Sequence, residues 1–167
     1  IILRTVSAAI MEKGIDVFDL GVAPTPFVFR ESIKYGNAII VTASHNPLEW
    51  NGLKFVINGR GMFEEELDSI QQQDATSNPG FGKSYHINSK YILDILEFMR
   101  KNRYLDDGRK RTNTVGLDPG GGAISSFIPK LYDSLNQDFL SINDIAGISS
   151  RSPDPTTDDL FELSKLV

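Results

Sequence analysis

Residues 39–57 read IIVTASHNPLEWNGLKFVI, and this stretch places a serine and a histidine side by side after an apolar, β-branched run. The run 39–41 is continuous rather than alternating, which is typical of a parallel strand with both faces covered. Residues 42–47 are small, polar or ring-closed, which is typical of a loop. A second apolar run at 55–57 follows Lys54. The stretch therefore predicts a strand, an exposed loop that carries Ser44 and His45, and another strand.

The composition indicates an ordinary globular protein. The chain has 167 residues, of which 40% are hydrophobic and 23% charged, so one domain or two small domains with packed cores are expected. The net charge of −5 gives no general attraction to nucleic acid or to anionic membranes, so we expect neither as a partner. Cysteine is absent, which excludes disulfides and thiolate metal sites. No apolar run approaches the roughly 20 residues that span a bilayer. A soluble, cytoplasmic protein is expected.

Helical and strand patterns alternate along the chain, which favours an α/β fold. Helical spacing predicts helices over 2–11, 27–34, 64–73, 92–99 and 123–135 and a last one after residue 157, and apolar runs predict strands over 17–20, 38–41, 54–57 and 114–118. Thr25, Ser89 and either Thr156 or Thr157 are the predicted N-caps. The polar stretch 74–83 predicts a linker, with domains over 1–86 and 87–167. His86, beside this linker, is expected to be solvated.

Taken from the residues alone, the Ser44–His45 pair has a structural and a functional interpretation. A hydroxyl and an imidazole commonly satisfy backbone groups within a loop. A hydrolase triad needs the histidine turned onto the hydroxyl and a carboxylate behind it, whereas neighbouring residues at a strand end tend to point apart. No G-x-S-x-G elbow is present, so serine hydrolysis fits poorly.

Phosphoryl transfer fits this stretch better, because a phosphoryl carrier needs surrounding donors and cations more than a base beneath it. His45 and Asn46 are nearby donors, and a turn at 51–52 would bring Lys54 back toward Ser44. The alternative for Lys54 is a solvated lysine at the start of a strand. A second candidate phosphate site is the glycine turn 118–122, although its spacing matches no known phosphate loop and favours a plain turn between strand and helix.

Four segments in the same order resemble the α-D-phosphohexomutases, the family of phosphoglucomutase, phosphomannomutase and phosphoglucosamine mutase. TASHNP at 42–47 with NGLK at 51–54 resembles the family's phosphoserine loop. GVAPTP at 21–26 resembles the turn that precedes this loop. VGLD at 115–118 with GGGA at 120–123, and RSPDPT at 151–156 with Leu160, resemble two segments of the family's second domain.

The resemblance implies an α/β fold of two incomplete three-layer α/β/α domains with mixed sheets, and an internal piece of a longer enzyme. It implies interconversion of hexose 1- and 6-phosphates through a bisphosphorylated sugar, with Ser44 as phosphoryl carrier and His45 and Lys54 as further catalytic residues. Thr42, Asn46 and Asn51 are the implied phosphate- and loop-binding residues.

The implied partner is a phosphorylated hexose, and hexose 1,6-bisphosphate is the implied activator and intermediate. Mg²⁺ is the implied cofactor, bound through the phosphate on Ser44 and by aspartates that lie beyond residue 167. The isolated chain is then expected to be inactive. The alternative is a catalytically inactive α/β module that binds sugar phosphates or another protein.

Overall fold

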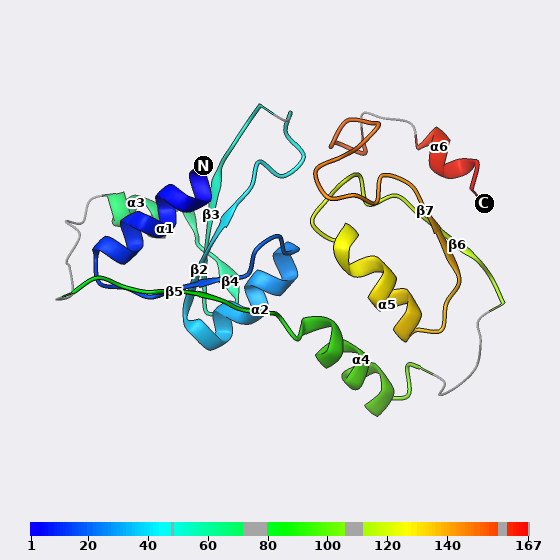
Figure 1. The fold of residues 1–167 in the computed structure, drawn as a ribbon, viewed down its shortest axis with the longest axis horizontal. Coiled ribbons are helices and arrows are strands. Elements are labelled where there is room, and N and C mark those ends of the chain that lie inside the picture. Colours follow the sequence, from blue (N-terminus) through cyan, green and yellow to red (C-terminus); the bar gives the residue numbers. More distant parts are fainter. Residues whose placement is uncertain (48, 72–79, 106–111, 157–159, 167) are drawn as a thin grey trace. The chain divides into compact units, whose positions relative to one another are not determined.

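The computed structural model describes residues 1–47, 49–71, 80–105, 112–156 and 160–166 (Figure 1). Helices and strands alternate as predicted: α1 Ile2–Glu12, β1 Val17–Asp19, α2 Thr25–Tyr35, β2 Asn37–Val41, β3 Leu53–Ile57, β4 Arg60–Gly61, α3 Glu64–Gln71, β5 Ser84–His86, α4 Tyr91–Lys101, β6 Val115–Leu117, the 3-10 turn η1 Ser125–Phe127, α5 Ile128–Ser134, β7 Phe139–Ser141 and α6 Phe161–Ser164.

The described residues form two compact units. The first comprises the described parts of 1–42 and 51–89, and the second those of 43–50 and 90–167. Both parallel and antiparallel strand pairs are present, so the predicted α/β class with mixed sheets is confirmed. The domain limits 1–86 and 87–167 stay a prediction. Among the described residues, no helix has the length and apolarity that crossing a membrane requires.

The two apolar runs on either side of the Ser44 loop form an antiparallel hairpin in the first unit. β2 pairs with β3 in a register that runs from Asn37 opposite Ile57 to Val41 opposite Leu53, and β4 extends the sheet. The expectation of a parallel strand at 38–41 is therefore wrong. A continuous apolar run fits either kind of strand when both faces are partly covered, and the burial pattern of β2 is of this kind.

The core of the first unit lies between α2 and this hairpin. Val56 is 1% exposed, and it packs with Val28 of α2 and Ile40 of β2. Ser32 is also buried, and its hydroxyl is satisfied by two hydrogen bonds. Its Oγ donates to the Phe29 carbonyl (2.8 Å) and accepts the N–H of Gly59 (2.8 Å). This hydroxyl ties α2 to the turn between β3 and β4.

Helix α2 begins at Thr25, the residue predicted as its cap. Pro24 has extended backbone angles, and its carbonyl accepts the N–H of Phe27 (2.9 Å), so Pro24 and not Thr25 is the N-cap. Pro26 occupies the first turn as predicted. An N–H at this position has no acceptor within the helix, so proline costs the helix no hydrogen bond. The helix ends at Gly36, whose φ of 88° is accessible to glycine at little cost.

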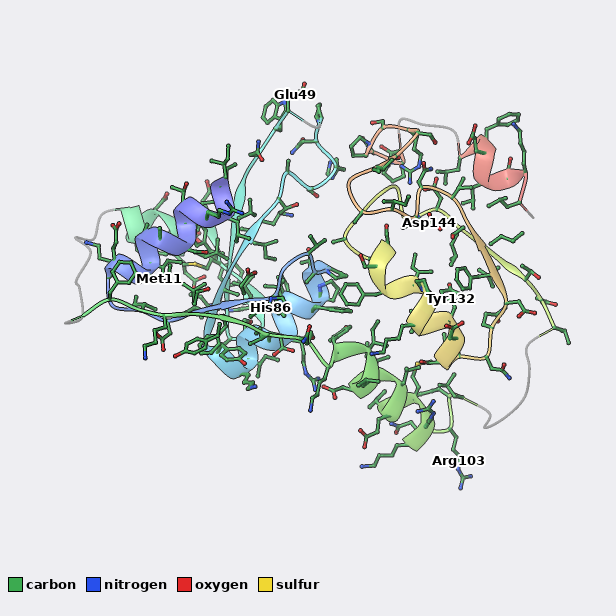
Figure 2. All side chains as sticks on the ribbon, viewed as in Figure 1. Met11, Glu49, His86, Arg103, Tyr132 and Asp144 are labelled. Atoms are coloured by element: carbon green, nitrogen blue, oxygen red, sulfur yellow. The ribbon has the colours of Figure 1, made fainter. Side chains whose placement is uncertain are left out.

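The segment around His86 is a strand and not part of a linker. β5 pairs in parallel with β1, with His86 opposite Asp19, and its side chain is exposed as expected (Figure 2). Phe18 of β1 stacks between Tyr35 (ring centroids 4.4 Å) and Tyr85 (5.3 Å). The sequence signal was weak because the strand has only three residues. Residues 72–79, which include the end of the predicted helix 64–73 and most of the predicted linker, lie outside the described residues.

The second unit contains helices α4 and α5 and the parallel pair β6–β7. The predicted apolar stripe of α4 is confirmed by Ile92 (7% exposed) and Leu96 (2%), but the N-cap is Lys90 and not Ser89. The predicted helix over 123–135 is η1 followed by the shorter α5. Tyr132 of α5, labelled in Figure 2, packs on Phe139 of β7 at 5.2 Å between ring centroids.

The last helix, α6, is capped by Leu160, so neither predicted cap precedes it directly. Thr157 lies outside the described residues. The short strands β4, β5 and β7 are additions to the predicted set of elements.

Candidate functional site

A backbone hydrogen bond closes the base of the loop that carries Ser44. The N–H of Thr42 donates to the carbonyl of Gly52 (2.9 Å), which extends the β2–β3 ladder by one bond beyond Val41. A Cβ on Gly52 would lie 3.0 Å from the Thr42 carbonyl oxygen, so a glycine suits this close approach. The Thr42 backbone therefore closes the base of the loop, and the expected phosphate- or loop-binding role of its side chain stays a prediction.

Inside the loop, local hydrogen bonds fix the backbone around Ser44. The side-chain Nδ2 of Asn46 donates to the Ala43 carbonyl (2.8 Å), and the Asn46 N–H donates to the same oxygen (3.1 Å). The N–H of Trp50 donates to the Pro47 carbonyl (2.9 Å). The side chain and the N–H of Asn46 thus both stabilise the loop, and its expected role in phosphate binding stays a prediction.

The backbone of Ser44 is left-handed, with φ at 58°. This conformation brings Ser44 Oγ to 3.3 Å from His45 Nδ1, and the tautomer of the imidazole decides which atom donates. The expectation that neighbouring side chains point apart is wrong here, because it assumed an extended backbone. Both residues are exposed, so an incoming ligand meets a hydroxyl and an imidazole together.

Lys54 lies on β3, directly opposite Ile40 in the ladder. Opposed residues of an antiparallel pair share a face, so Lys54 continues the face on which Ile40 and Val56 are buried. Unlike them it is exposed, as is Asn51 before it. The hairpin confirms that the chain folds back after the loop, whereas the expected approach of Lys54 to Ser44 stays a prediction.

The glycine turn 119–122 uses its own N–H groups internally. Gly120 N–H donates to Asp118 Oδ1 (2.8 Å), Gly121 N–H to the Asn143 carbonyl (2.7 Å) and Gly122 N–H to the Pro119 carbonyl (2.9 Å). A phosphate cradle needs such groups to be available to the ligand. The plain turn between strand and helix, which the sequence favoured, is therefore the better interpretation.

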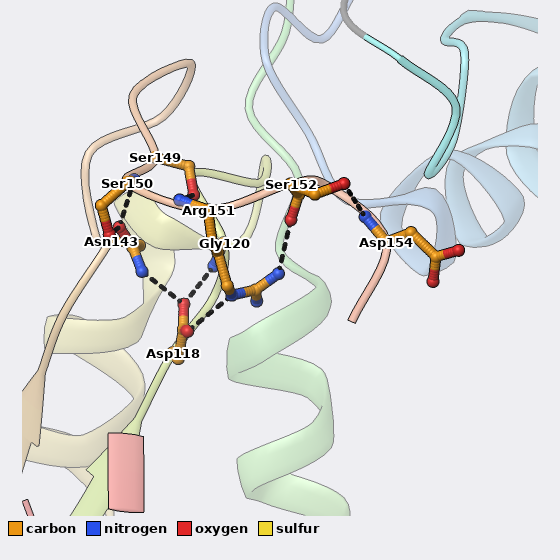
Figure 3. Close-up of polar contacts among 8 residues, drawn as sticks. All are labelled: Asp118, Gly120, Asn143, Ser149, Ser150, Arg151, Ser152 and Asp154. Atoms are coloured by element: carbon orange, nitrogen blue, oxygen red, sulfur yellow. Dashed lines mark hydrogen bonds and ion pairs between the residues drawn. The ribbon is translucent and has the colours of Figure 1, made fainter. Parts of the chain in front are cut away.

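An ion pair between Asp118 and Arg151 was missed by the sequence reasoning (Figure 3). Arg151 Nε donates to Asp118 Oδ2 (2.7 Å), with side chains 14% and 3% exposed respectively. Burial acts to raise the pKa of Asp118, but hydrogen bonds from Arg151, Gly120 and Asn143 outweigh it and hold that pKa below its usual value. Both residues lie in recognisable segments, but 33 residues separate them and no local pattern pairs them.

No group of three or more histidine, aspartate or glutamate side chains converges within the described residues. Mg²⁺ prefers several oxygen ligands in octahedral geometry. A phosphate on Ser44 would supply only part of such a set, so the described residues alone do not form a Mg²⁺ site.

Comparison with known proteins identifies the class of this chain. Residues 1–78 match the family model for phosphoglucomutase/phosphomannomutase, alpha/beta/alpha domain I. A phosphoglucomutase/phosphomannomutase family protein of Burkholderia thailandensis has the same fold, with a TM-score of 0.70 at 20% identity over 99% of this chain and 37% of that one. The stretch that carries the TASHNP loop therefore matches the phosphoglucomutase/phosphomannomutase family, and nearly the whole chain shares the fold of a protein of that family.

Among curated relatives, the similar proteins are named as amino-sugar mutases. Probable phosphoglucosamine mutases of Pyrococcus abyssi and Thermococcus kodakarensis are 33% and 32% identical over 98% and 100% of this chain. A phosphoglucosamine/phosphogalactosamine mutase of Sulfurisphaera tokodaii is 25% identical over 99%. The chain spans 37%, 38% and 39% of the length of these three relatives.

Proposed function

We propose that the full gene product containing this chain is a phosphohexomutase that interconverts hexose 1- and 6-phosphates, with Ser44 as its phosphoryl carrier. One observation carries this proposal: the exposed Ser44 hydroxyl, held in a left-handed conformation beside an imidazole, within the family's signature loop. Strained backbone of this kind persists at functional sites when the surrounding contacts impose it. Here the hydrogen bond from Thr42 to the Gly52 carbonyl and the two from Asn46 to the Ala43 carbonyl are such contacts.

The reaction consists of two phosphoryl transfers. In the first, the P–Oγ bond of phosphoserine 44 breaks and a new P–O bond forms to the free sugar hydroxyl, whose proton passes to a base while Ser44 Oγ takes up a proton. The product is a hexose bisphosphate, which turns over in the site. In the second, the other sugar P–O bond breaks, that sugar oxygen is protonated, and Ser44 Oγ gives its proton to a base as it accepts this second phosphoryl group.

The remaining residues have supporting roles in this scheme. His45 Nδ1, next to Ser44 Oγ, contacts the phosphoryl oxygens or the serine hydroxyl, depending on the phosphorylation state. Lys54 supplies positive charge where the transferred oxygens become more negative, or moves a proton at the sugar hydroxyl. Thr42 and Asn46 hold the loop, and Asn51 contacts phosphate from the far side of the hairpin. When bound, Mg²⁺ would neutralise charge on the transferred group, with its further ligands outside the described residues.

The substrate class is a hexose phosphate, and we place glucosamine phosphates first. The curated relatives named above carry that substrate in their names. This choice rests on the names of those relatives.

A mutase assay with the full gene product tests the proposal. Glucosamine, mannose and glucose 6-phosphates are supplied with the matching 1,6-bisphosphate, and formation of the 1-phosphate is followed by NMR. We expect turnover with at least one sugar and its loss in Ser44→Ala, with Ser69→Ala on α3 as the matched control. Tight binding of the sugars without turnover would instead identify an inactive binding module.

A further inference from the structure

Strand β3 is flanked by the two Asn-Gly dipeptides of this chain, 51–52 directly before it and 58–59 directly after it. An asparagine followed by glycine loses its side-chain amide readily, because glycine has no Cβ to hinder attack by its own backbone nitrogen. Both Asn51 and Asn58 are exposed, so solvent reaches both amides. The two dipeptides therefore have the same local chemistry, and they differ in how their backbones are held.

The turn at 58–59 is fixed by hydrogen bonds from both of its N–H groups. The Asn58 N–H donates to the Gly36 carbonyl (2.8 Å), and the Gly59 N–H donates to Oγ of the buried Ser32 (2.8 Å). Asn58 and Gly59 also have left-handed backbones, with φ of 47° and 83°, in the tight connection between β3 and β4. The nitrogen that would attack the Asn58 amide is thus engaged, in a turn that has to open before it can react.

The dipeptide at 51–52 is held much less. Among the described residues, no hydrogen bond is made by the Asn51 side chain, the Asn51 N–H or the Gly52 N–H. The one hydrogen bond of this dipeptide is at the Gly52 carbonyl, which accepts the Thr42 N–H (2.9 Å) at the base of the Ser44 loop. The peptide between Asn51 and Gly52 can therefore rotate toward the side-chain amide without breaking a hydrogen bond.

We propose that Asn51 is a site of spontaneous deamidation in the native protein, that the reaction opens the base of the Ser44 loop, and that Asn58 is protected from it. In the first step the Gly52 nitrogen loses its proton and bonds to Cγ of Asn51, the Cγ–Nδ2 bond breaks, and ammonia leaves with a proton. Water then opens the resulting succinimide ring. Cleavage of the C–N bond at Cγ gives aspartate, and cleavage at the main-chain carbonyl carbon gives isoaspartate.

Isoaspartate changes the base of the loop because its main chain runs through the former side chain. It therefore carries one extra backbone carbon directly before Gly52. Gly52 has little room to shift, since a Cβ on it would lie 3.0 Å from the Thr42 carbonyl oxygen, and its own carbonyl holds the Thr42 N–H. The added carbon displaces this carbonyl, so the hydrogen bond that closes the loop weakens.

Peptide mapping of the full gene product during incubation at mildly alkaline pH tests the modification site. Mass spectrometry follows the conversion of each asparagine, and electron-based fragmentation separates isoaspartate from aspartate. In the native protein we expect Asn51 to react about tenfold faster than Asn58 or more, because two hydrogen bonds must break before the Asn58 turn opens. In concentrated urea, where neither arrangement persists, the two should react at similar rates.

A variant tests the reason for the protection of Asn58. Ser32→Ala removes the acceptor of the Gly59 N–H and should accelerate deamidation at Asn58 while leaving Asn51 unchanged. Ser69→Ala, which removes an exposed hydroxyl on α3, is the matched control and should alter neither rate. Circular dichroism shows whether Ser32→Ala keeps the native fold. The comparison of native protein with urea decides the proposal whatever the stability of this variant.

Hydrogen exchange at the Thr42 amide tests the effect on the loop. We expect faster exchange in aged protein whose residue 51 is largely isoaspartate. Fresh Asn51→Asp protein, which has the same charge without the extra backbone carbon, should keep the exchange rate of the unmodified protein.

The possible outcomes decide the two parts separately. Equal rates at Asn51 and Asn58 in the native protein, or an Asn51 that survives there while both react in urea, would overturn the modification site. Unchanged Thr42 exchange in protein that carries isoaspartate at residue 51 would overturn the effect on the loop. None of these measurements depends on mutase activity, so the inference is tested apart from the proposed function.

Discussion

At the residue scale, the unusual backbone of Ser44 accounts for most of the site's geometry. A left-handed conformation costs a residue with a Cβ about 1–2 kcal/mol, so the surrounding contacts must impose it. Its effect is to place Oγ beside His45 Nδ1 and to leave both groups exposed. The strained backbone and the exposed side chain together distinguish Ser44 from a serine whose hydroxyl serves only to hydrogen-bond backbone groups of its loop.

Lys54→Ala should lower kcat about a hundredfold while leaving Ser44 able to accept a phosphoryl group. The reason is that one charged group aimed at a transition state contributes on this scale, whereas the carrier oxygen is untouched. Steady-state kinetics and phosphopeptide mapping check the two halves, with Lys83→Ala before β5 as the control. Near-normal turnover would show instead that Lys54 is a solvated lysine at the start of a strand.

The sequence predicted the loop and the fold-back after it, because a short motif fixes both. Ser44, His45 and Asn46 lie in one loop, as TASHNP predicts, and the fold-back that carries Lys54 is present. The close approach of Ser44 and His45 was beyond prediction, because a positive φ at a serine depends on contacts around the whole loop. The Asp118–Arg151 pair was missed for a similar reason, since it joins distant segments.

At the element scale, helix α3 begins with an ionic cap. Glu66 accepts the N–H of Phe63 at 2.8 Å, as the third-position glutamate of a capping box does, and forms a two-point ion pair with Arg60 at 2.8 and 2.5 Å. The hydrogen bond from Arg60, then that from Phe63, lowers the pKa of Glu66 from 4.5 to about 2.

Glu66→Gln should lower the thermal midpoint near neutral pH but not near pH 2. A carboxyl whose pKa is depressed in the folded state stabilises it above the unfolded value of 4.5, and this contribution disappears as pH falls to about 2. Thermal unfolding across that range, with Glu65→Gln as control, checks the expectation. A difference between wild type and Glu66→Gln that did not change with pH would contradict it.

Gly82→Ala should destabilise the protein by about 2 kcal/mol or more. A Cβ at Gly82 would lie 1.9 Å from the Ile15 carbonyl oxygen, so the backbone before β5 would have to separate from the α1–β1 connection. Gly61→Ala is the matched control, because its Cβ would meet nothing within 4 Å. Equal denaturation midpoints for the two variants would show that the backbone at Gly82 accommodates a Cβ without loss of stability.

Long periodic segments were predictable at this scale, and very short ones were not. The helices α1, α2 and α4 follow apolar spacing that is visible in the local sequence, and each overlaps the range predicted for it. β4, β5 and β7 have two or three residues each, and their existence depends on a partner strand elsewhere in the chain. The direction of β2 was misjudged for the same reason.

At the scale of the whole molecule, the 167-residue chain exposes many large apolar side chains. Ile33 is 65% exposed, Phe63 62%, Phe81 65% and Phe98 60%. Expressed alone, the chain should therefore self-associate, bind a hydrophobic dye and show no mutase turnover. Size-exclusion chromatography with light scattering, dye fluorescence and the mutase assay check these points. A monomer with cooperative unfolding and mutase turnover would contradict the expectation.

The central claim is that Ser44 carries the phosphoryl group in the full gene product, and a pulse and chase experiment tests it most directly. The protein is treated with hexose 1,6-bisphosphate labelled in its phosphoryl groups, then with unlabelled hexose 6-phosphate, and phosphopeptides are mapped at each stage. We predict that label appears on Ser44 alone, passes to the sugar during the chase, and is absent in Ser44→Ala. Label on another residue that chases into the sugar, with Ser44 unmodified, would contradict the account.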